Sequence, residues 1–177
     1  MSERISFQGE PGANSHIAAH EAYPELEPLP CPSFEDAFAA VSEGQARYAM
    51  IPVENSVAGR VADVHTLIPE SGLYIIGERF VPIRHQLLGL KGATISGLTH
   101  VRSHPQALGQ CRKQLRDLGV VAVKTADTAG AAREIAELNN PKVGALASSL
   151  AAEIYGLDVL KADIADAAHN TTRFLVF

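Results

Sequence analysis

Apolar and polar positions along this chain repeat in the order of a short strand followed by a longer helix. Ile5 to Phe7 is a short apolar run, and the glycine-bearing turn after it leads to Ser15, a residue suited to cap a helix. Leu26 to Cys31 is demoted to an edge strand, because its two prolines remove N–H donors from a sheet ladder. Ser33 opens an amphipathic helix, and Tyr48 to Val53 is a buried strand.

The pattern changes after a predicted helix over Arg60 to Ile68. Tyr74 to Val81 and His85 to Leu90 are consecutive extended runs, which predict that the chain crosses here from one lobe into a second. A return crossing is predicted near Leu160 to Asp166, and Thr172 to Phe177 is an apolar strand that rejoins the first lobe. The predicted lobes are therefore residues 1–82 plus 166–177, and residues 83–165.

Within the second lobe, three strand-helix pairs follow one another. They are Thr99 to Arg102 with Ser103 to Leu118, Val120 to Lys124 with Asp127 to Asn139, and Val143 to Leu146 with Ser148 to Tyr155. Such repeats predict an α/β architecture with mainly parallel sheets, whose connecting loops gather in a cleft between the lobes. Helices capped by Ser15, Ser103, Asp127 and Ser148 would present unpaired amides to a small anion in that cleft.

Composition narrows the class of protein. The 177 residues are 46% hydrophobic and 20% charged, as in an ordinary globular protein that needs no disulfide or metal for stability. A net charge of -5 without a basic run argues against nucleic acid and membrane surfaces as partners. Cys31 and Cys111 are isolated in sequence and are predicted to be reduced, buried thiols. The start has no targeting segment and no apolar stretch is long enough to span a membrane, so we expect a cytoplasmic protein.

Several polar residues stand where a fold places chemistry. Glu54, Asn55 and Ser56 follow a buried strand, and Thr172 with Arg173 opens the last one. Further candidates lie in the second lobe. They are Ser103, Gln106 and Gln110, which would share one face of a helix, and His85 at the presumed hinge. Other histidines are interpreted as surface or helix-end residues: His16, His20, His65, His100 and His104. The glycine turn from Gly9 to Ser15 fits neither a dinucleotide fingerprint nor a P-loop, and is more simply a tight turn than a ligand loop.

Taken together, five segments resemble the catalytic domain of prephenate dehydratase. They are Gly9 to Ser15, PVENSVAG from Pro52 to Gly59, HQLL from His85 to Leu88, SHPQALGQC from Ser103 to Cys111, and NTTRF from Asn170 to Phe174. The resemblance spans essentially the whole chain. It implies a two-lobed fold like that of the type II periplasmic binding proteins, with the active site in the interlobe cleft.

The resemblance also implies an activity without a cofactor or metal: conversion of prephenate to phenylpyruvate, with loss of carbon dioxide and water, in phenylalanine biosynthesis. Thr172 matches the catalytic threonine and would donate a hydrogen bond or proton to the leaving hydroxyl. Because threonine is a weak acid, Thr172 is alternatively a relay for water or for Glu54. Asn55, Ser103 and Gln110 match active-site positions that supply neutral donors. The predicted substrate-binding set is completed by Ser15, Ser56, Gln106, His85 and Arg173.

Some alternatives stay open at this point. Arg173 either clamps a substrate carboxylate or forms a structural salt bridge, because in a regular strand it would face away from Thr172. The substrate could be arogenate instead of prephenate, or the fold could be a small-anion-binding module without chemistry. A homodimer is expected by resemblance alone. Many members of this family continue into a regulatory ACT domain that binds phenylalanine, whereas this sequence ends at Phe177, so we expect it to show no allosteric response to phenylalanine.

Overall fold

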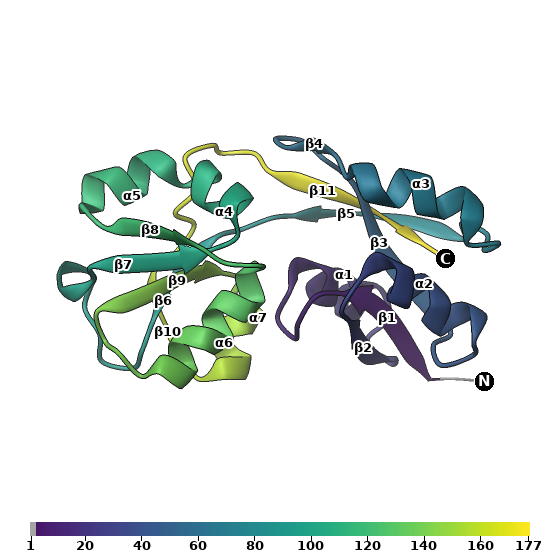
Figure 1. Cartoon of the computed structure of the whole chain (residues 1–177), viewed down its shortest axis with the longest axis horizontal. Coiled ribbons are helices and arrows are strands. Elements are labelled where there is room, and N and C mark those ends of the chain that lie inside the picture. Colours follow the sequence, from purple (N-terminus) through teal and green to yellow (C-terminus); the bar gives the residue numbers. More distant parts are fainter. Residues whose placement is uncertain (1–2) are drawn as a thin grey trace. The chain divides into compact units, whose positions relative to one another are not determined.

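The computed structural model describes residues 3–177 and divides into two compact units (Figure 1). Unit 1 contains the chain up to residue 10, residues 14–83 and residues 169–177; unit 2 contains residues 11–13 and 84–168. The sequence places the two lobe crossings after residues 82 and 165. The units change after residues 83 and 168, and residues 11–13 form an additional short excursion into unit 2.

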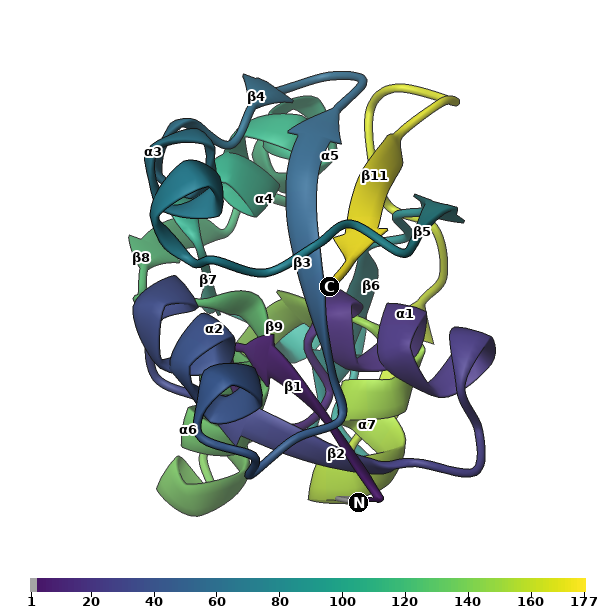
Figure 2. The ribbon, with the colours of Figure 1, turned by 90° about the vertical axis from the view of Figure 1, so that its right-hand side faces the viewer.

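Unit 1 is built on a six-stranded sheet with the order β2-β1-β3-β11-β5, and β4 pairs with β3 beside this path (Figure 2). Its strands are β1 (Arg4–Gln8), β2 (Glu27–Cys31), β3 (Tyr48–Asn55), β4 (Gly59–Arg60), β5 (Gly77–Pro82) and β11 (Thr171–Val176). β2 pairs with β1 and lies at the edge of the sheet, as its prolines predict. The C-terminal strand β11 lies between β3 and β5 and is antiparallel to both. Two segments that are distant in sequence are thereby joined side by side.

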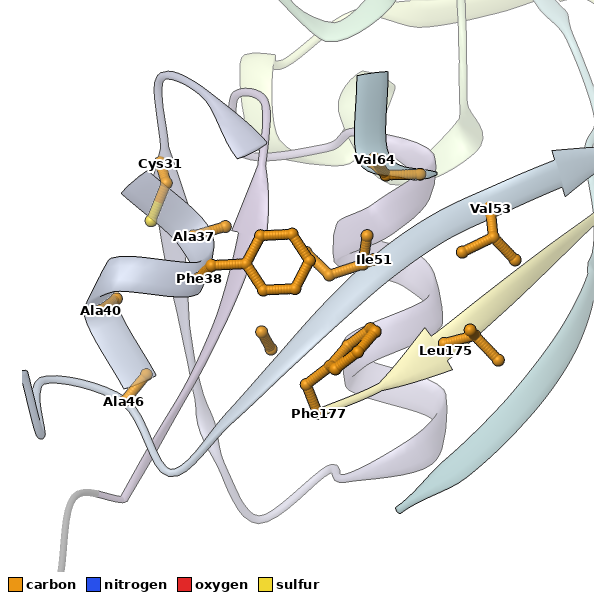
Figure 3. Close-up of a cluster of buried hydrophobic side chains, with 11 residues drawn as sticks. Cys31, Ala37, Phe38, Ala40, Ala46, Ile51, Val53, Val64, Leu175 and Phe177 are labelled. Atoms are coloured by element: carbon orange, nitrogen blue, oxygen red, sulfur yellow. The ribbon is translucent and has the colours of Figure 1, made fainter. Parts of the chain in front are cut away.

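Three helices cover the faces of this sheet: α1 (Asn14–Ala22), α2 (Phe34–Ser42) and α3 (Ala62–Glu70). Ser33 caps α2, accepting a hydrogen bond from the Asp36 N–H as the sequence predicts. On the α2 and α3 side, Phe38 meets Phe177 edge-on with ring centroids 5.1 Å apart, and Val64 of α3 joins the same cluster (Figure 3). On the α1 side a second cluster contains Phe174 and Val176. Each face of the sheet therefore has a buried apolar cluster.

Unit 2 has a five-stranded sheet with the order β10-β6-β9-β7-β8. Its strands are β6 (Gln86–Gly89), β7 (His100–Ser103), β8 (Val121–Lys124), β9 (Val143–Ala147) and β10 (Asp158–Lys161). The helices are α4 (Pro105–Gln110), α5 (Arg112–Leu118), α6 (Thr128–Leu138) and α7 (Ser149–Tyr155), with a 3₁₀ turn at Ile95–Gly97. Alternating residues of the strands pack against α6 and α7 on one face and against α4 and α5 on the other (Figure 1).

Both sheets are mixed, so the prediction of mainly parallel sheets is wrong. The parallel pairs are β1 with β2, β1 with β3, β7 with β8, and β7 with β9; the other five pairs are antiparallel. Four of the five antiparallel pairs involve the strands next to the predicted crossings, β5, β6, β10 and β11, and the fifth joins β3 to the short β4. The return crossing predicted near Leu160 to Asp166 overlaps the end of β10, which pairs with β6 before the chain leaves unit 2. Strands that enter or leave a unit have no crossover helix of their own, and the parallel rule does not extend to them.

The helix predicted over Ser103 to Leu118 is two helices that meet at Cys111. Ser103 is the last residue of β7, and His104 caps α4 instead, its Nδ1 accepting from the Gln106 N–H at 3.1 Å. The N-terminus of α5 is capped from a distance by Asp166, whose carboxylate accepts from the N–H groups of Lys113 and Gln114 at 3.0 and 3.2 Å. A capping residue so distant in sequence cannot be found from a local motif.

The glycine turn before α1 has a structural explanation. Gly12 has a φ of 95° and lies against Ala151, where an added Cβ would approach the Ala151 Cα to 2.8 Å. The Ser148 hydroxyl, which also caps α7, donates to the Gly12 carbonyl at 2.6 Å. Residues 11–13 consequently belong to unit 2, which supports the interpretation of a tight turn. Ser15 lies within α1 as its second residue and is buried, so its prediction as a helix cap is wrong.

Candidate active site

The register of unit 1 brings two sequence candidates into direct contact. Thr172 of β11 lies opposite Asn55 of β3, and the Asn55 Nδ2 donates to the Thr172 Oγ1 at 2.9 Å. The same Nδ2 donates to the Asn170 Oδ1 at 2.7 Å. All three residues are only 8% exposed. Segments 117 residues apart therefore form one buried cluster of neutral polar groups, which we name the threonine cluster: Asn55, Asn170 and Thr172.

The Asn55 amide is held in a single orientation. Its Oδ1 accepts from the backbone N–H groups of Val57 and Ala58 at 3.0 and 2.9 Å, so the oxygen is identified by groups that can only donate. The nitrogen must then point toward Thr172 and Asn170. With both hydrogens of Nδ2 engaged, Asn55 has no donor left for a substrate. The role of Asn55 as a substrate donor stays a prediction, and these hydrogen bonds favour one in which Asn55 orients Thr172.

This arrangement prepares the Thr172 hydroxyl to donate. Because Oγ1 accepts a hydrogen from Asn55, the hydroxyl's own hydrogen is available to another acceptor. A hydroxyl that accepts one hydrogen bond is polarised into a stronger donor, and a buried setting with a low dielectric strengthens the effect. The geometry thus supports a positioned hydrogen-bond or proton donor at Thr172.

The neighbours of Asn55 in the sequence have different surroundings. Ser56 lies at the end of the ladder, where its Oγ accepts from the Thr171 N–H at 2.9 Å and its own N–H donates to the Thr171 carbonyl. Glu54 is exposed and lies opposite Arg173. Successive strand residues point to opposite faces, so Glu54 is directed away from the face on which Thr172 meets Asn55. A direct relay from Glu54 through Thr172 has no support in this register.

Arg173 forms the salt bridge that was one of its two predicted roles. Its Nε and Nη2 both approach the Glu78 Oε2 at 2.9 Å, across from β11 to β5. The side chains are 41% and 49% exposed, so the pair contributes on the order of 1 kcal/mol at most to the free energy of unfolding. A contact between Arg173 and a substrate carboxylate stays a prediction. It would require Arg173 to leave Glu78 or to bind both carboxylates at once.

In unit 2, the structure joins His85 to Gln110. His85 Nε2 lies 2.6 Å from the Gln110 Oε1, and the His85 carbonyl accepts from the Ile164 N–H. An amide oxygen can only accept, so the Nε2 carries the hydrogen. Burial lowers the pKa of His85 below its usual 6.5, and the hydrogen bond to Gln110 opposes part of that shift. His85 is therefore neutral at physiological pH.

The lowered pKa predicts how stability depends on pH. In the unfolded chain His85 binds a proton below about pH 6.5, whereas in the folded chain it binds one only at lower pH. The contribution of neutral His85 to the free energy of unfolding is therefore present above pH 6.5 and is lost as the pH falls toward the folded pKa. Burial, with His20 nearby, lowers the pKa of His16 too, which adds to the same trend.

The variant His85→Gln tests this trend, because it keeps a donor for Gln110 and removes one titrating group. We expect its urea midpoint to fall less between about pH 7.5 and 5.5 than that of the parent chain. The exposed His100→Gln variant is the control, and equal pH slopes in all three proteins would contradict the prediction.

The other predicted substrate residues are placed differently. Ser103 is fully buried and its hydroxyl donates to the Leu146 carbonyl at 2.7 Å, which binds β7 to β9 and leaves no donor for a substrate. Gln106 is exposed and lies one turn before Gln110 on α4. Ser15 is buried in α1 of unit 1. These substrate contacts stay predictions, and the geometry favours a structural role for Ser103.

Two residues of the site were missed by the sequence interpretation. Asn170 stands in the NTTRF segment but was not chosen, because nothing in the sequence shows that it meets Asn55. His65 was interpreted as a surface or helix-end residue, yet it is half-buried and its Nε2 lies 3.1 Å from the Val53 carbonyl. The Asn170 contact depends on pairing between segments distant in sequence, and the His65 contact depends on how α3 packs against β3.

The structure shows the surroundings of both cysteine side chains. Cys31 and Cys111 are buried and free, as predicted. Burial, with the Asp166 carboxylate as a smaller cause, raises the pKa of Cys111 to about 12, so this thiol is unreactive at neutral pH. Between residues 3 and 177, no group of three or more His, Cys, Asp or Glu side chains is arranged to hold a metal ion. In the same range, none of the helices has both the length and the apolar character needed to cross a bilayer.

Comparison with known families shows to which family the chain belongs. The prephenate dehydratase family model matches residues 5–177, a range that contains all of unit 2, nearly all of unit 1 and every residue of the threonine cluster. The chain belongs to the prephenate dehydratase family. This confirms the resemblance drawn from the five sequence motifs.

Curated relatives of this prephenate dehydratase family member share nearly half of its residues. A bifunctional N-acyl-homoserine lactone acylase/prephenate dehydratase of Komagataeibacter europaeus is 46% identical over 97% of this chain and 61% of its own length. An arogenate dehydratase/prephenate dehydratase of Arabidopsis thaliana, named as chloroplastic, is 44% identical over 98% of this chain and 44% of its own length. The chain thus spans less than two thirds of either relative. Their names cover two dehydratase substrates, so the family supports dehydratase chemistry without deciding between them.

A solved structure extends the likeness to the fold. The prephenate dehydratase of Arthrobacter aurescens, determined in complex with L-Phe, superposes with a TM-score of 0.90 at 30% identity. The match covers 98% of this chain and 59% of the other. The mixed α/β fold with two sheets is therefore the fold of prephenate dehydratases, and the prediction of a two-lobed α/β protein is confirmed.

Proposed function

We propose that this chain catalyses the decarboxylating dehydration of prephenate to phenylpyruvate, with Thr172 as the donor to the departing hydroxyl. The observation that carries the proposal is the hydrogen bond from the Asn55 Nδ2 to the Thr172 Oγ1 inside a buried cluster. The family match supplies the reaction class, and the threonine cluster supplies a donor suited to it.

The chemistry requires such a donor. The bond from the ring to the carboxylate breaks, its electron pair enters the ring, and the bond from the opposite ring carbon to its hydroxyl breaks. Carbon dioxide leaves at one end, and at the other the hydroxyl takes one proton and leaves as water. Thr172 would share or transfer that proton and recover it from solvent. Formation of the aromatic ring drives the reaction, so the protein has to orient the substrate and stabilise the departing oxygen.

The neutral character of the threonine cluster suits this task. Prephenate carries two carboxylates, and an ionised carboxylate beside Thr172 would repel them and compete for its hydrogen. The cluster instead consists of two amides and a hydroxyl, and Glu54 is directed to the other face of the sheet. Gln106 of unit 2 and Ser56 are the neutral donors that we assign to substrate binding, and His85 holds Gln110 through the hydrogen on its Nε2.

The direct test is turnover by the purified chain. Prephenate should yield phenylpyruvate with no nucleotide or metal added, and a chelator should leave the rate unchanged. Arogenate is the second candidate substrate, because relatives named arogenate dehydratase are as similar to the chain as those named for prephenate. Measuring kcat/KM for both substrates under the same conditions decides between them.

Two results would overturn the proposal. Binding of prephenate without turnover would leave a binding module of the same fold, and dependence on a metal would require a different mechanism. The homodimer implied by the family resemblance stays a prediction, and sedimentation of the same sample measures it.

A further inference from the structure

Strand β3 contains an extra residue next to the threonine cluster. Thr172 and Phe174 of β11 lie opposite Asn55 and Pro52 of β3, so two steps along β11 match three along β3. Arg173 pairs with Glu54, and Val53 is left without a partner in β11. β11 itself is regular, because its pairing with β5 continues without a shift. The irregularity is therefore a β-bulge at Val53 of β3.

The bulge decides which face of the sheet Asn55 occupies. Ile51 and Val53 belong to the cluster on the α2 and α3 side (Figure 3). With strict alternation, Asn55 would follow them onto that face. Phe174, on the same face of β11 as Thr172, belongs to the opposite cluster on the α1 side. The extra residue shifts the alternation by one, and this shift allows the Asn55 amide to reach Thr172.

The bulged residue gives up its place in the ladder with β11, and its carbonyl is satisfied elsewhere. The Val53 carbonyl accepts from the Val61 N–H at 3.1 Å and lies 3.1 Å from the His65 Nε2. A carbonyl can only accept, so the Nε2 of His65 carries the hydrogen and donates it. Val53 is 3% exposed, and a buried carbonyl needs such partners. His65 is the side chain that holds the bulge from α3.

Val64 and His65, which are adjacent in α3, make different contacts. Val64, the residue before it, is fully buried in the cluster beneath α3, whereas Thr66, the residue after it, is exposed. Val64, with Leu67 and Ile68, thus anchors α3 in the apolar cluster, and His65 makes the hydrogen bond to the Val53 carbonyl. The two functions are separable by substitution.

We infer that His65 is a positioning residue for Thr172, acting through the bulge at Val53 and the Asn55 amide. The inference rests on the proposed function for its effect on rate. Loss of the His65 donor leaves the Val61 N–H on the carbonyl, so the fold is retained while the bulge is held less tightly. A displacement of about 1 Å in a reacting group can cost about 10²-fold in rate.

The test compares variants at position 65 with matched changes beside it. His65→Leu removes the donor, and His65→Gln places an amide nitrogen where the Nε2 was. Thr66→Ala changes the exposed neighbour, and Val64→Ala loosens the seating of α3 while keeping the His65 donor. The measurements are kcat, KM, the thermal midpoint, and the ¹⁵N-detected side-chain amide signals of Asn55.

We expect His65→Leu to lower kcat by about 10- to 100-fold with KM nearly unchanged, and to shift the Asn55 amide signals. His65→Gln should restore most of the rate and the signals. Thr66→Ala should match the parent chain, and Val64→Ala should lower the thermal midpoint while leaving kcat within about two-fold. If the leucine variant does not fold, His65→Asn, which is too short to reach the carbonyl, takes its place against His65→Gln.

The inference is wrong if the leucine variant keeps both kcat and the Asn55 signals, or if Val64→Ala loses as much rate as His65→Leu. Failure of the proposed function is a separate result. In that case the parent chain shows no turnover of prephenate or arogenate, and the Asn55 signals alone decide whether His65 holds the bulge.

Discussion

Thr172→Ala is expected to lower kcat by about 10² to 10⁴-fold, the usual contribution of a positioned proton donor, with a much smaller change in KM. The reason is that the hydroxyl acts on the departing oxygen, so its interaction is stronger in the transition state than with bound substrate. Steady-state rates with prephenate measure both constants. The variant also leaves one hydrogen of the buried Asn55 amide without its acceptor, and we expect a loss of about 1–3 kcal/mol in the free energy of unfolding.

Two further variants give this result its meaning. Thr172→Ser keeps the hydroxyl and should retain part of the rate. Thr171→Ala changes the adjacent threonine, which contacts Ser56 through its backbone and lies on the other face of β11, so kcat should stay near that of the parent chain. A near-normal kcat for Thr172→Ala would assign the proton to another group.

Asn55→Asp is expected to lower kcat by about 10² to 10³-fold, comparable to removal of one preorganised donor from an active site. The aspartate carboxylate can still accept hydrogen bonds from the N–H groups of Val57 and Ala58. Its second oxygen, however, can only accept a hydrogen bond from Thr172, whereas the Asn55 amide donates one to Thr172. The Thr172 hydrogen would then turn to the carboxylate and away from the substrate. Rates of the variant and the parent chain, measured in parallel, test this reversal.

The pH dependence of Asn55→Asp separates a reversed hydrogen bond from simple disruption. At low pH the carboxyl group is protonated and can donate again, so the ratio of variant to parent kcat should rise as pH falls. Asn140→Asp is the control, because it introduces the same charge at an exposed residue whose Oδ1 accepts from the Lys142 N–H. A flat ratio across pH, or an equal loss in Asn140→Asp, would contradict the assigned role of Asn55.

Local patterns in the sequence determined much of the fold. The apolar run of β1, the Ser33 cap of α2 and the prolines of the edge strand β2 are signals carried by a few neighbouring residues, and each is confirmed. The order of five motifs likewise identified the family, because motif order belongs to the sequence alone. The position of Thr172 at the start of a strand that returns to the first lobe was also predictable.

Tertiary structure alone decided how the site is assembled. The bulge at Val53, which turns Asn55 toward Thr172, arises from pairing between β3 and β11, and periodicity in β3 would place Asn55 on the other face. Two other contacts also depend on tertiary packing: Asp166 caps α5 from outside the helix, and Gly12 joins unit 2 through Ser148. In each case a polar group takes a partner that is distant in sequence. Local propensity carries no information on such pairs, since they form only when packing has set which strands and helices are neighbours.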